Sequence, residues 1–207
     1  MKLVASSVAC LLLAASSSAN EEPATTQHLR SLQSSSSRQS DWIKTHNAAR
    51  KKYQVQYGGT YAPIKWSNSL KNKAASLAKS MAQTNNCDYI PPSSSDYGVN
   101  YYKTMMMATK PAVSAVMTNW EKTLKKKDGK AASYPANGPM TQVLWSSTGY
   151  VGCAEARNSD SSNWCYATVC LYAKAGNCNM NSYLPDWKKA VVEGPGCGKC
   201  PPNVATC

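Results

Sequence analysis

Few side chains in this sequence could carry chemistry, and the first candidate is a histidine. The chain has two histidines, and His46 falls in a segment with helical spacing, where it could act as a lone general base because imidazole titrates near neutral pH. A solitary histidine on the helix of a packed domain is more often a hydrogen-bonded structural residue. Because the sequence pairs it with no nucleophile or orienting carboxylate, a structural role is favoured and no catalytic residue is assigned.

The second candidate is the redox-type spacing of Cys197-Gly198-Lys199-Cys200. A thioredoxin-type site needs a strand before the motif and a helix that starts at it, which together lower a thiol pKa. The flanks here are Gly-Pro-Gly and Pro-Pro, which supply neither. The sequence therefore favours structural disulfides, and oxidised cysteines do not ligate zinc.

The start of the chain predicts secretion. Residues 1–19 combine Met1-Lys2, an apolar run and small residues before a cleavage point after Ala19, which is the pattern of a secretory signal. The apolar run is too short to span a bilayer, and no later stretch reaches the required length. We therefore expect a secreted, extracellular protein without a transmembrane segment.

Cysteine usage agrees with an oxidising compartment. Of the nine cysteines, Cys10 would leave with the signal, and the even number that remains predicts disulfides. These cysteines are Cys87, Cys153, Cys165, Cys170, Cys178, Cys197, Cys200 and Cys207. Their count alone cannot fix which pairs form.

The positions of apolar residues predict three helices and a hairpin. Helical spacing starts at Asp41 and ends before Gly58-Gly59; a second stripe runs from Leu70 to Ala82, and a third helix starts near Pro111. Tyr150 to Glu155 and Trp164 to Tyr172 predict two strands that pair as an antiparallel hairpin. This order indicates an α+β fold, an α-β-α sandwich of helices over a short antiparallel sheet.

The remaining segments lack such periodicity. Residues 20–40 are Ser-rich with almost no large apolar side chains, which predicts a disordered arm. Residues 41–178 form the predicted domain. Residues 179–207, rich in Gly, Pro and Cys, predict a disulfide-stapled, hinge-like extension without helical or strand period.

The net charge of +12 and the isoelectric point near 9.3 indicate attraction to anionic cell walls, membrane surfaces or acidic polysaccharide. Nucleic-acid binding is not expected, because the protein is secreted and shows no recognised nucleic-acid module. The densest basic cluster favours a solvated helix end over a binding patch. It consists of Lys122, Lys125, Lys126, Lys127 and Lys130.

Two specific motifs lie in the second half of the chain, Thr141-Gln142-x-x-Trp145 and Cys170-x-Tyr172-x-x-x-Gly176-Asn177. They resemble the paired signatures of the CAP superfamily, which holds cysteine-rich secretory proteins, antigen 5 and plant pathogenesis-related 1 proteins. Upstream, His46-Asn47-x-x-Arg50 is similar to the motif that opens the CAP domain. The resemblance implies that Cys153 pairs with Cys170 and Cys87 with Cys165, and that the other four cysteines pair among themselves.

The same resemblance implies a cleft where many relatives gather two His and two Glu, a set suited to a divalent metal. In this chain the corresponding positions hold Ser94, Val99, Thr123 and Pro139. Glu121 is a poor substitute for the glutamate that relatives carry at the position of Thr123. It lies two residues earlier, and each residue along a helix turns the side chain by about 100°, so we expect Glu121 to point away from the cleft. We therefore expect no metal, no cofactor and no enzymatic activity.

Binding remains as the expected activity. The stretch with Tyr97, Tyr101, Tyr102, Met105 and Met106 could line a groove for an apolar ligand, although such residues are more often core. Since some CAP proteins carry sterols or fatty acids, sterol or lipid binding is the leading hypothesis. The alternative is a secreted effector or defence-related protein that acts by protein-protein contact with a host or by contact with a cell-wall component.

Overall fold

The computed structural model describes residues 24–207 apart from 85, 92–95, 108, 127, 159–163, 179 and 184–185. Side chains are described from residue 37 onward, except 181 and 183. Residues Ser35–Cys207 form one unit, and every contact below lies within it. The predicted signal, residues 1–19, lies outside the described residues.

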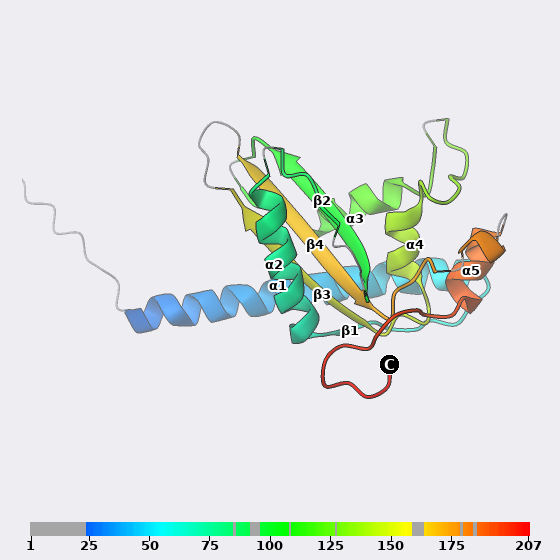
Figure 1. Ribbon diagram of the computed structural model, residues 1–207, viewed down its shortest axis with the longest axis horizontal. Coiled ribbons are helices and arrows are strands. Elements are labelled where there is room, and N and C mark those ends of the chain that lie inside the picture. The colour runs from blue at the N-terminus through cyan, green and yellow to red at the C-terminus, as the bar shows by residue number, and fades with distance from the viewer. Residues whose placement is uncertain are drawn as a thin grey trace, which may run out of the picture. The chain divides into compact units, whose positions relative to one another are not determined.

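A four-stranded sheet in the order β1-β3-β4-β2 forms the centre of this unit (Figure 1). The strands are β1 (Lys65–Trp66), β2 (Gly98–Met105), β3 (Tyr150–Arg157) and β4 (Cys165–Ala173). The predicted hairpin is confirmed, since β3 and β4 pair antiparallel. The sheet is mixed rather than wholly antiparallel, because β1 pairs parallel with β3. A parallel pair needs a long connection, and three helices of the described residues lie between these two strands.

Helices cover both faces of the sheet, which confirms the predicted α+β sandwich (Figure 1). They are α1 (Ala24–Gln56), α2 (Asn68–Ala82), α3 (Val113–Lys122), α4 (Gly138–Leu144) and α5 (Trp187–Glu193). On one face, α2 buries Leu70 and Ala74 against β4 residues that include Val169. On the other, Trp42 of α1 packs with residues of α3, α4 and α5.

The predicted stripe of α2 is confirmed, and its small residues allow a close approach to the sheet. Ser67 caps the helix, because its hydroxyl oxygen accepts from the Leu70 amide at 3.3 Å. A Cβ added at Gly152 of β3 would lie 2.6 Å from the Leu70 carbonyl carbon. The helix backbone therefore rests directly on the strand at this glycine.

The predicted start of α1 at Asp41 is wrong, because the helix begins at Ala24. Residues 24–40, expected to be a disordered arm, contain neither Gly nor Pro, and extending a formed helix adds one hydrogen bond per residue. The last turn of this segment is also anchored, since Arg38 pairs with Glu155 and donates to the Pro111 carbonyl at 2.7 Å.

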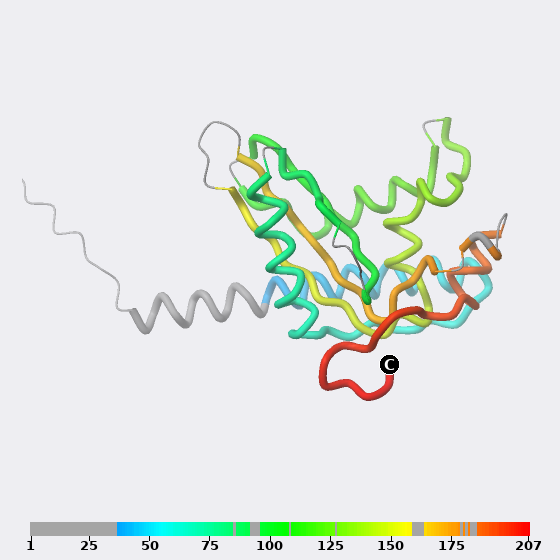
Figure 2. Tube along the Cα trace, viewed as in Figure 1, coloured from blue at the N-terminus to red at the C-terminus, as the bar shows by residue number. Residues whose placement is uncertain are grey.

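The C-terminal segment is more regular than predicted. Residues 187–193 form α5, which is too short to show a clear period in the sequence. The Asp186 carboxylate caps it by accepting from the Lys189 amide at 3.2 Å. Trp187, Ala190 and Val191 are buried in the main core. This part of the predicted extension therefore belongs to the same packed unit (Figure 2).

Four disulfides link the chain, and two of them are the pairs that the resemblance implied; the resemblance left open the order among the other four cysteines. Cys87 is bonded to Cys165, and Cys153 to Cys170 across the hairpin. In the C-terminal segment, Cys178 is bonded to Cys197 and Cys200 to Cys207. The two cysteines of the redox-type spacing, Cys197 and Cys200, are not bonded to each other. Each belongs to a different structural disulfide.

Candidate functional site

A cavity of about 510 Å³ lies where β2, α3 and α4 meet. Val99 of β2, Thr123 at the end of α3 and Pro139 of α4 all contribute to its lining. The other lining side chains include Asn100, Asn119 and further neutral residues, and among the described residues no His, Asp, Glu, Lys or Arg lines it. The fold thus brings together three of the four positions that the resemblance placed in a cleft; Ser94 lies outside the described residues.

Glu121 lies on the other side of α3, as its position along the helix predicted. Its carboxylate accepts from Lys52 Nζ at 2.8 Å and from the Tyr53 hydroxyl. These contacts with the end of α1 lower the pKa of Glu121. The Glu121 carboxylate therefore lies outside the lining of the central cavity.

His46 is fully buried, and both of its ring nitrogens have partners. Nδ1 lies 2.8 Å from the Trp42 carbonyl oxygen, which only accepts, so this nitrogen carries the proton. Nε2 then accepts from the Tyr172 hydroxyl at 3.0 Å. Burial lowers the pKa of His46 to about 4. The ring is a neutral structural group that solvent does not reach, which excludes a role as general base towards an external substrate.

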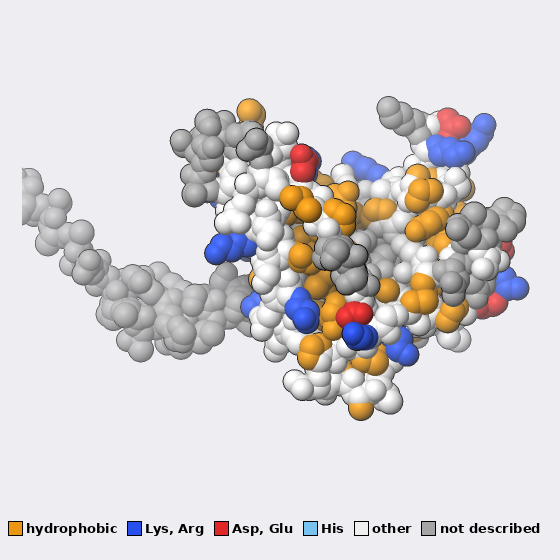
Figure 3. Space-filling model, in the orientation of Figure 1, with side chains coloured by type: hydrophobic (Ala, Val, Ile, Leu, Met, Phe, Trp, Pro, Cys, Tyr) orange, Lys and Arg blue, Asp and Glu red, His pale blue; other side chains and the backbone are white. Residues whose placement is uncertain are grey.

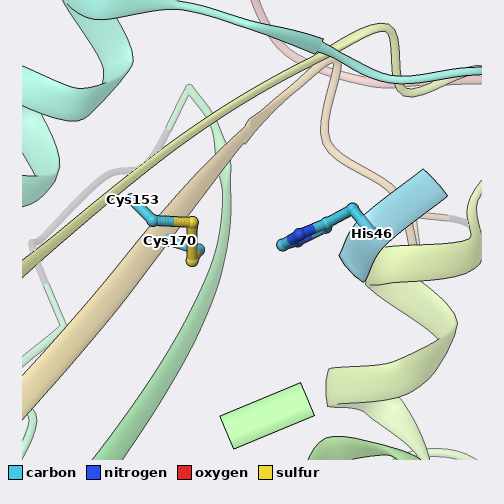
Figure 4. A group of neighbouring side chains, drawn as sticks. All are labelled: His46, Cys153 and Cys170. Atoms are coloured by element: carbon cyan, nitrogen blue, oxygen red, sulfur yellow. A yellow bond between two sulfur atoms is a disulfide. The ribbon is translucent and has the colours of Figure 1, made fainter. Parts of the chain in front are cut away.

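His46 also belongs to a group of potential metal ligands with Cys153 and Cys170, whose donor atoms lie within 4.8 Å of one another. Figure 4 shows the imidazole pointing toward the sulfur atoms and the bond that joins those sulfurs. Disulfide sulfurs carry no thiolate charge, and both imidazole nitrogens are already hydrogen-bonded. This group is therefore part of the core and not a metal centre.

The buried imidazole predicts a loss of stability in mild acid. Its pKa is about 4 in the folded chain against 6.5 for an exposed histidine, so the unfolded chain binds the proton first as pH falls. The contribution of the neutral His46 to the free energy of unfolding is fully present above pH 6.5. It declines as the pH falls toward 4, by about 3 kcal/mol over the whole window. Urea denaturation between pH 7 and pH 5 should show this decline in wild type and a flatter profile in His46→Gln.

Asn47 and Arg50, in the same motif, are structural as well. The Asn47 side chain makes two hydrogen bonds to the backbone of Ile64: its Oδ1 accepts from the amide at 2.8 Å and its Nδ2 donates to the carbonyl at 3.2 Å. The Arg50 guanidinium is buried and donates to five backbone carbonyls between 2.7 and 3.2 Å. Those carbonyls belong to Ala62, Val143, Trp145, Ser146 and Thr148. Burial lowers the pKa of Arg50 to about 10.

The two signatures bind to each other. Thr141 Oγ1 donates to Asn177 Oδ1 at 2.7 Å, and Asn177 Nδ2 donates to the Gly138 carbonyl at 2.8 Å. Gln142 Oε1 accepts from the Gly176 amide at 3.0 Å. These bonds hold α4 against the chain that leaves β4.

Trp145 and Tyr172 extend this network in two directions. Trp145 Nε1 donates to the Pro195 carbonyl at 3.1 Å, which fixes the segment after α5. The Tyr172 hydroxyl accepts from Asn100 Nδ2 at 3.2 Å while it donates to His46. Asn100 Nδ2 also donates to the Pro139 carbonyl at 2.7 Å, so the network reaches the wall of the central cavity.

The residues predicted to line an apolar groove are divided between the two faces of the sheet. Tyr97 and Met105 pack toward the α2 cluster, whereas Tyr102 packs toward the opposite cluster. Tyr101 is 51% exposed and Met106, past the end of β2, is 75% exposed. Successive side chains of a strand point to opposite faces, so these five do not form one groove. Of them, Tyr101 lines the central cavity.

Among the described residues, no helix has the length and apolar character to cross a membrane.

Residues 43–172 match the family described as "Cysteine-rich secretory protein family", or CAP. The chain belongs to this family. It is 31% identical over 108 residues to the "Cysteine-rich venom protein helothermine" of Heloderma horridum horridum, a match that covers 50% of this chain and 43% of that protein. The matched part is thus less than half the length of this venom relative, and CAP proteins of this kind are generally extracellular.

Two solved structures show the CAP fold with low sequence identity. Na-ASP-1 is 19% identical, with a TM-score of 0.51 over 68% of this chain and 39% of that chain. NaASP2, which has a crystal structure with Zn2+, is 20% identical, with a TM-score of 0.51 over 67% of this chain and 80% of that chain. At this identity the likeness extends to the fold alone.

Proposed function

We propose that the protein is an extracellular CAP-family protein that acts by binding and not by catalysis. The observation that carries this proposal is the lining of the central cavity, where Val99, Thr123 and Pro139 meet and the described side chains are neutral. General acid-base catalysis needs a group that exchanges a proton near the working pH. His46 does not provide one there, because it is buried and hydrogen-bonded at both nitrogens.

The same cavity does not suit a zinc ion. NaASP2 has a crystal structure with Zn2+, and protein zinc sites use imidazole, thiolate and carboxylate ligands. A valine side chain offers no donor atom, and a proline ring offers neither a lone pair nor a proton. The amides of Asn100 and Asn119 are weaker ligands for this metal. We therefore derive no reaction step through a metal in this chain.

An apolar ligand, a sterol or a fatty acid, is the class that we propose for the binding activity. Its support is a set of exposed apolar side chains along and beside the edge strand β2. Ile90 is 67% exposed and Met106 75%, and the Tyr89 ring stacks on Tyr101 with centroids 4.6 Å apart. Figure 3 shows hydrophobic side chains exposed over the strands between α2 and α4. We call Ile90, Tyr101, Met106 and Met107 the β2-edge patch.

Titration of the secreted protein with a fluorescent sterol and with a labelled fatty acid tests this proposal. We expect wild type to bind saturably at micromolar ligand. A Tyr101→Ala/Met106→Gln variant should bind about tenfold more weakly, because the ligand would lose its apolar contacts with both side chains. Val55→Gln is the control, since Val55 is an exposed apolar residue on α1 outside the patch. Absence of saturable uptake, or equal losses in both variants, would contradict the β2-edge patch as the ligand site.

A further inference from the structure

A second cavity, of about 450 Å³, lies on the other side of α3, between the C-terminal ends of α1 and α3 and the start of α5. It shares no lining residue with the central cavity. Helix α3 separates the two, because Glu121 and Lys122 face the second cavity while Trp120 and Thr123 face the first. We call this cavity the lysine pocket, after the lysines in its lining, Lys52, Lys122, Lys125 and Lys188.

Three aromatic rings form one wall of the lysine pocket. The Tyr57 ring meets the Trp187 ring edge-on, with centroids 5.4 Å apart and planes at 85°, and lies 5.8 Å from the Tyr53 ring. Trp187 is almost fully buried, which fixes this wall in place. A rigid aromatic surface of this kind packs against the C–H face of a sugar ring at little cost in side-chain entropy.

The charge of the pocket is positive and partly unneutralised. The one carboxylate in the lining, Glu121, is already paired with Lys52 at 2.8 Å. Lys122, Lys125 and Lys188 are exposed and have no acidic partner within 4.0 Å among the described residues. Such ammonium groups around one cavity favour a ligand that carries carboxylates or sulfates.

The remaining lining suits a polar ligand better than an acyl chain. Gln56 and Thr118 offer amide and hydroxyl groups, whereas Leu124 and Ala131 are the aliphatic members. A neighbouring cavity of about 550 Å³ shares Gln56, Tyr57 and Lys188 with the lysine pocket, so the binding surface is elongated. In that neighbour, Glu193 pairs with Lys189 at 3.7 Å, so among the described residues the lysine without an acidic partner there is Lys188, which the two cavities share.

We infer that the lysine pocket binds an acidic oligosaccharide. One sugar ring packs against the partly exposed Tyr57, which the buried Trp187 supports from behind. Its anionic substituents contact Lys122, Lys125 and Lys188. The chain of sugars continues toward the neighbouring cavity past Gln56. This site is distinct from the β2-edge patch, so the inference goes beyond the binding of an apolar ligand.

Calorimetric titration with an oligogalacturonate that has free carboxylates tests the inference, using the full secreted chain. We expect a Lys122→Gln/Lys125→Gln variant to bind about tenfold more weakly, because two charge contacts are lost. The matched control is Lys71→Gln/Lys73→Gln, which removes the same charge from exposed positions on α2 and should change affinity by less than about twofold. The methyl-esterified oligomer, which has the same backbone without the charge, should bind weakly to all forms.

Three results would overturn the inference. Equal losses in the two double variants would mean that net charge alone attracts the oligomer. Equal affinity for the free and the esterified oligomer would exclude recognition of carboxylates. Binding to phosphatidylserine vesicles without binding to oligogalacturonate would assign the lysines to a membrane surface. Sterol uptake by the Lys122→Gln/Lys125→Gln variant should equal that of wild type, so the lysine pocket and the β2-edge patch can fail separately.

Discussion

Replacing Arg50 by methionine is expected to lower the free energy of unfolding by at least about 3 kcal/mol, because buried carbonyls would lose their donors. The guanidinium donates to five carbonyl oxygens, and three of these belong to residues 143, 145 and 146 at the end of α4. Methionine fills much of the volume but donates no hydrogen bond. Arg50→Lys should also destabilise, since an ammonium has three donors and lacks the planar fork that reaches all five oxygens.

Urea denaturation with the disulfides intact measures this effect. Lys51→Met is the matched control, because Lys51 is the exposed neighbour on the same helix and its loss should cost less than about 0.5 kcal/mol. If Arg50→Met were as stable as Lys51→Met, the carbonyls at the end of α4 would have other donors. That outcome would refute the view that this motif holds the fold together.

The second large effect is expected from Gly152→Ala, which places a methyl group between β3 and α2. The added Cβ would lie 2.6 Å from the carbonyl carbon and 2.7 Å from the Cβ of Leu70. Since the obstacle includes helix backbone, the whole of α2 must shift from the sheet. We expect a loss of about 2–3 kcal/mol, as for other overpacked cores.

Gly149→Ala provides the control for Gly152→Ala. The nearest atom to a Cβ at Gly149 is the Cys207 carbonyl oxygen at 3.6 Å, an ordinary contact. This variant should be unchanged or slightly more stable, because alanine reduces the entropy of the unfolded chain. The thermal midpoints of the two variants make the comparison, and equal midpoints would show that α2 does not rest on Gly152.

The sequence predicted those elements whose signals are local. Alternating apolar residues identified the hairpin of β3 and β4, and the small-residue stripe after Ser67 identified α2. By contrast, α5 has seven residues, too few for a period, and its Trp187 is buried only because α1 and α4 are near. The Ser-rich start of α1 has low helix propensity, yet nothing in it breaks a helix.

The sites were harder to predict than the fold. Tyr101 and Tyr102 are neighbours in sequence, but strand geometry sends them to opposite faces, and the predicted groove divides accordingly. The lysine pocket joins α1, α3 and α5, which lie far apart along the chain, so no local pattern marks it. Lys122 and Lys125, two lysines of the cluster expected to form a solvated helix end, are exposed and also line this pocket.

Zinc titration by calorimetry tests most directly the claim that this CAP protein acts by binding without a metal centre. We expect no saturable one-to-one binding by wild type at micromolar zinc, because the central cavity offers neutral side chains. A Thr123→Glu/Pro139→His variant, which supplies two suitable ligands to that cavity, should gain such binding. The chain's second histidine is His28. One-to-one zinc binding by the wild-type chain that persists in His28→Gln would contradict the account.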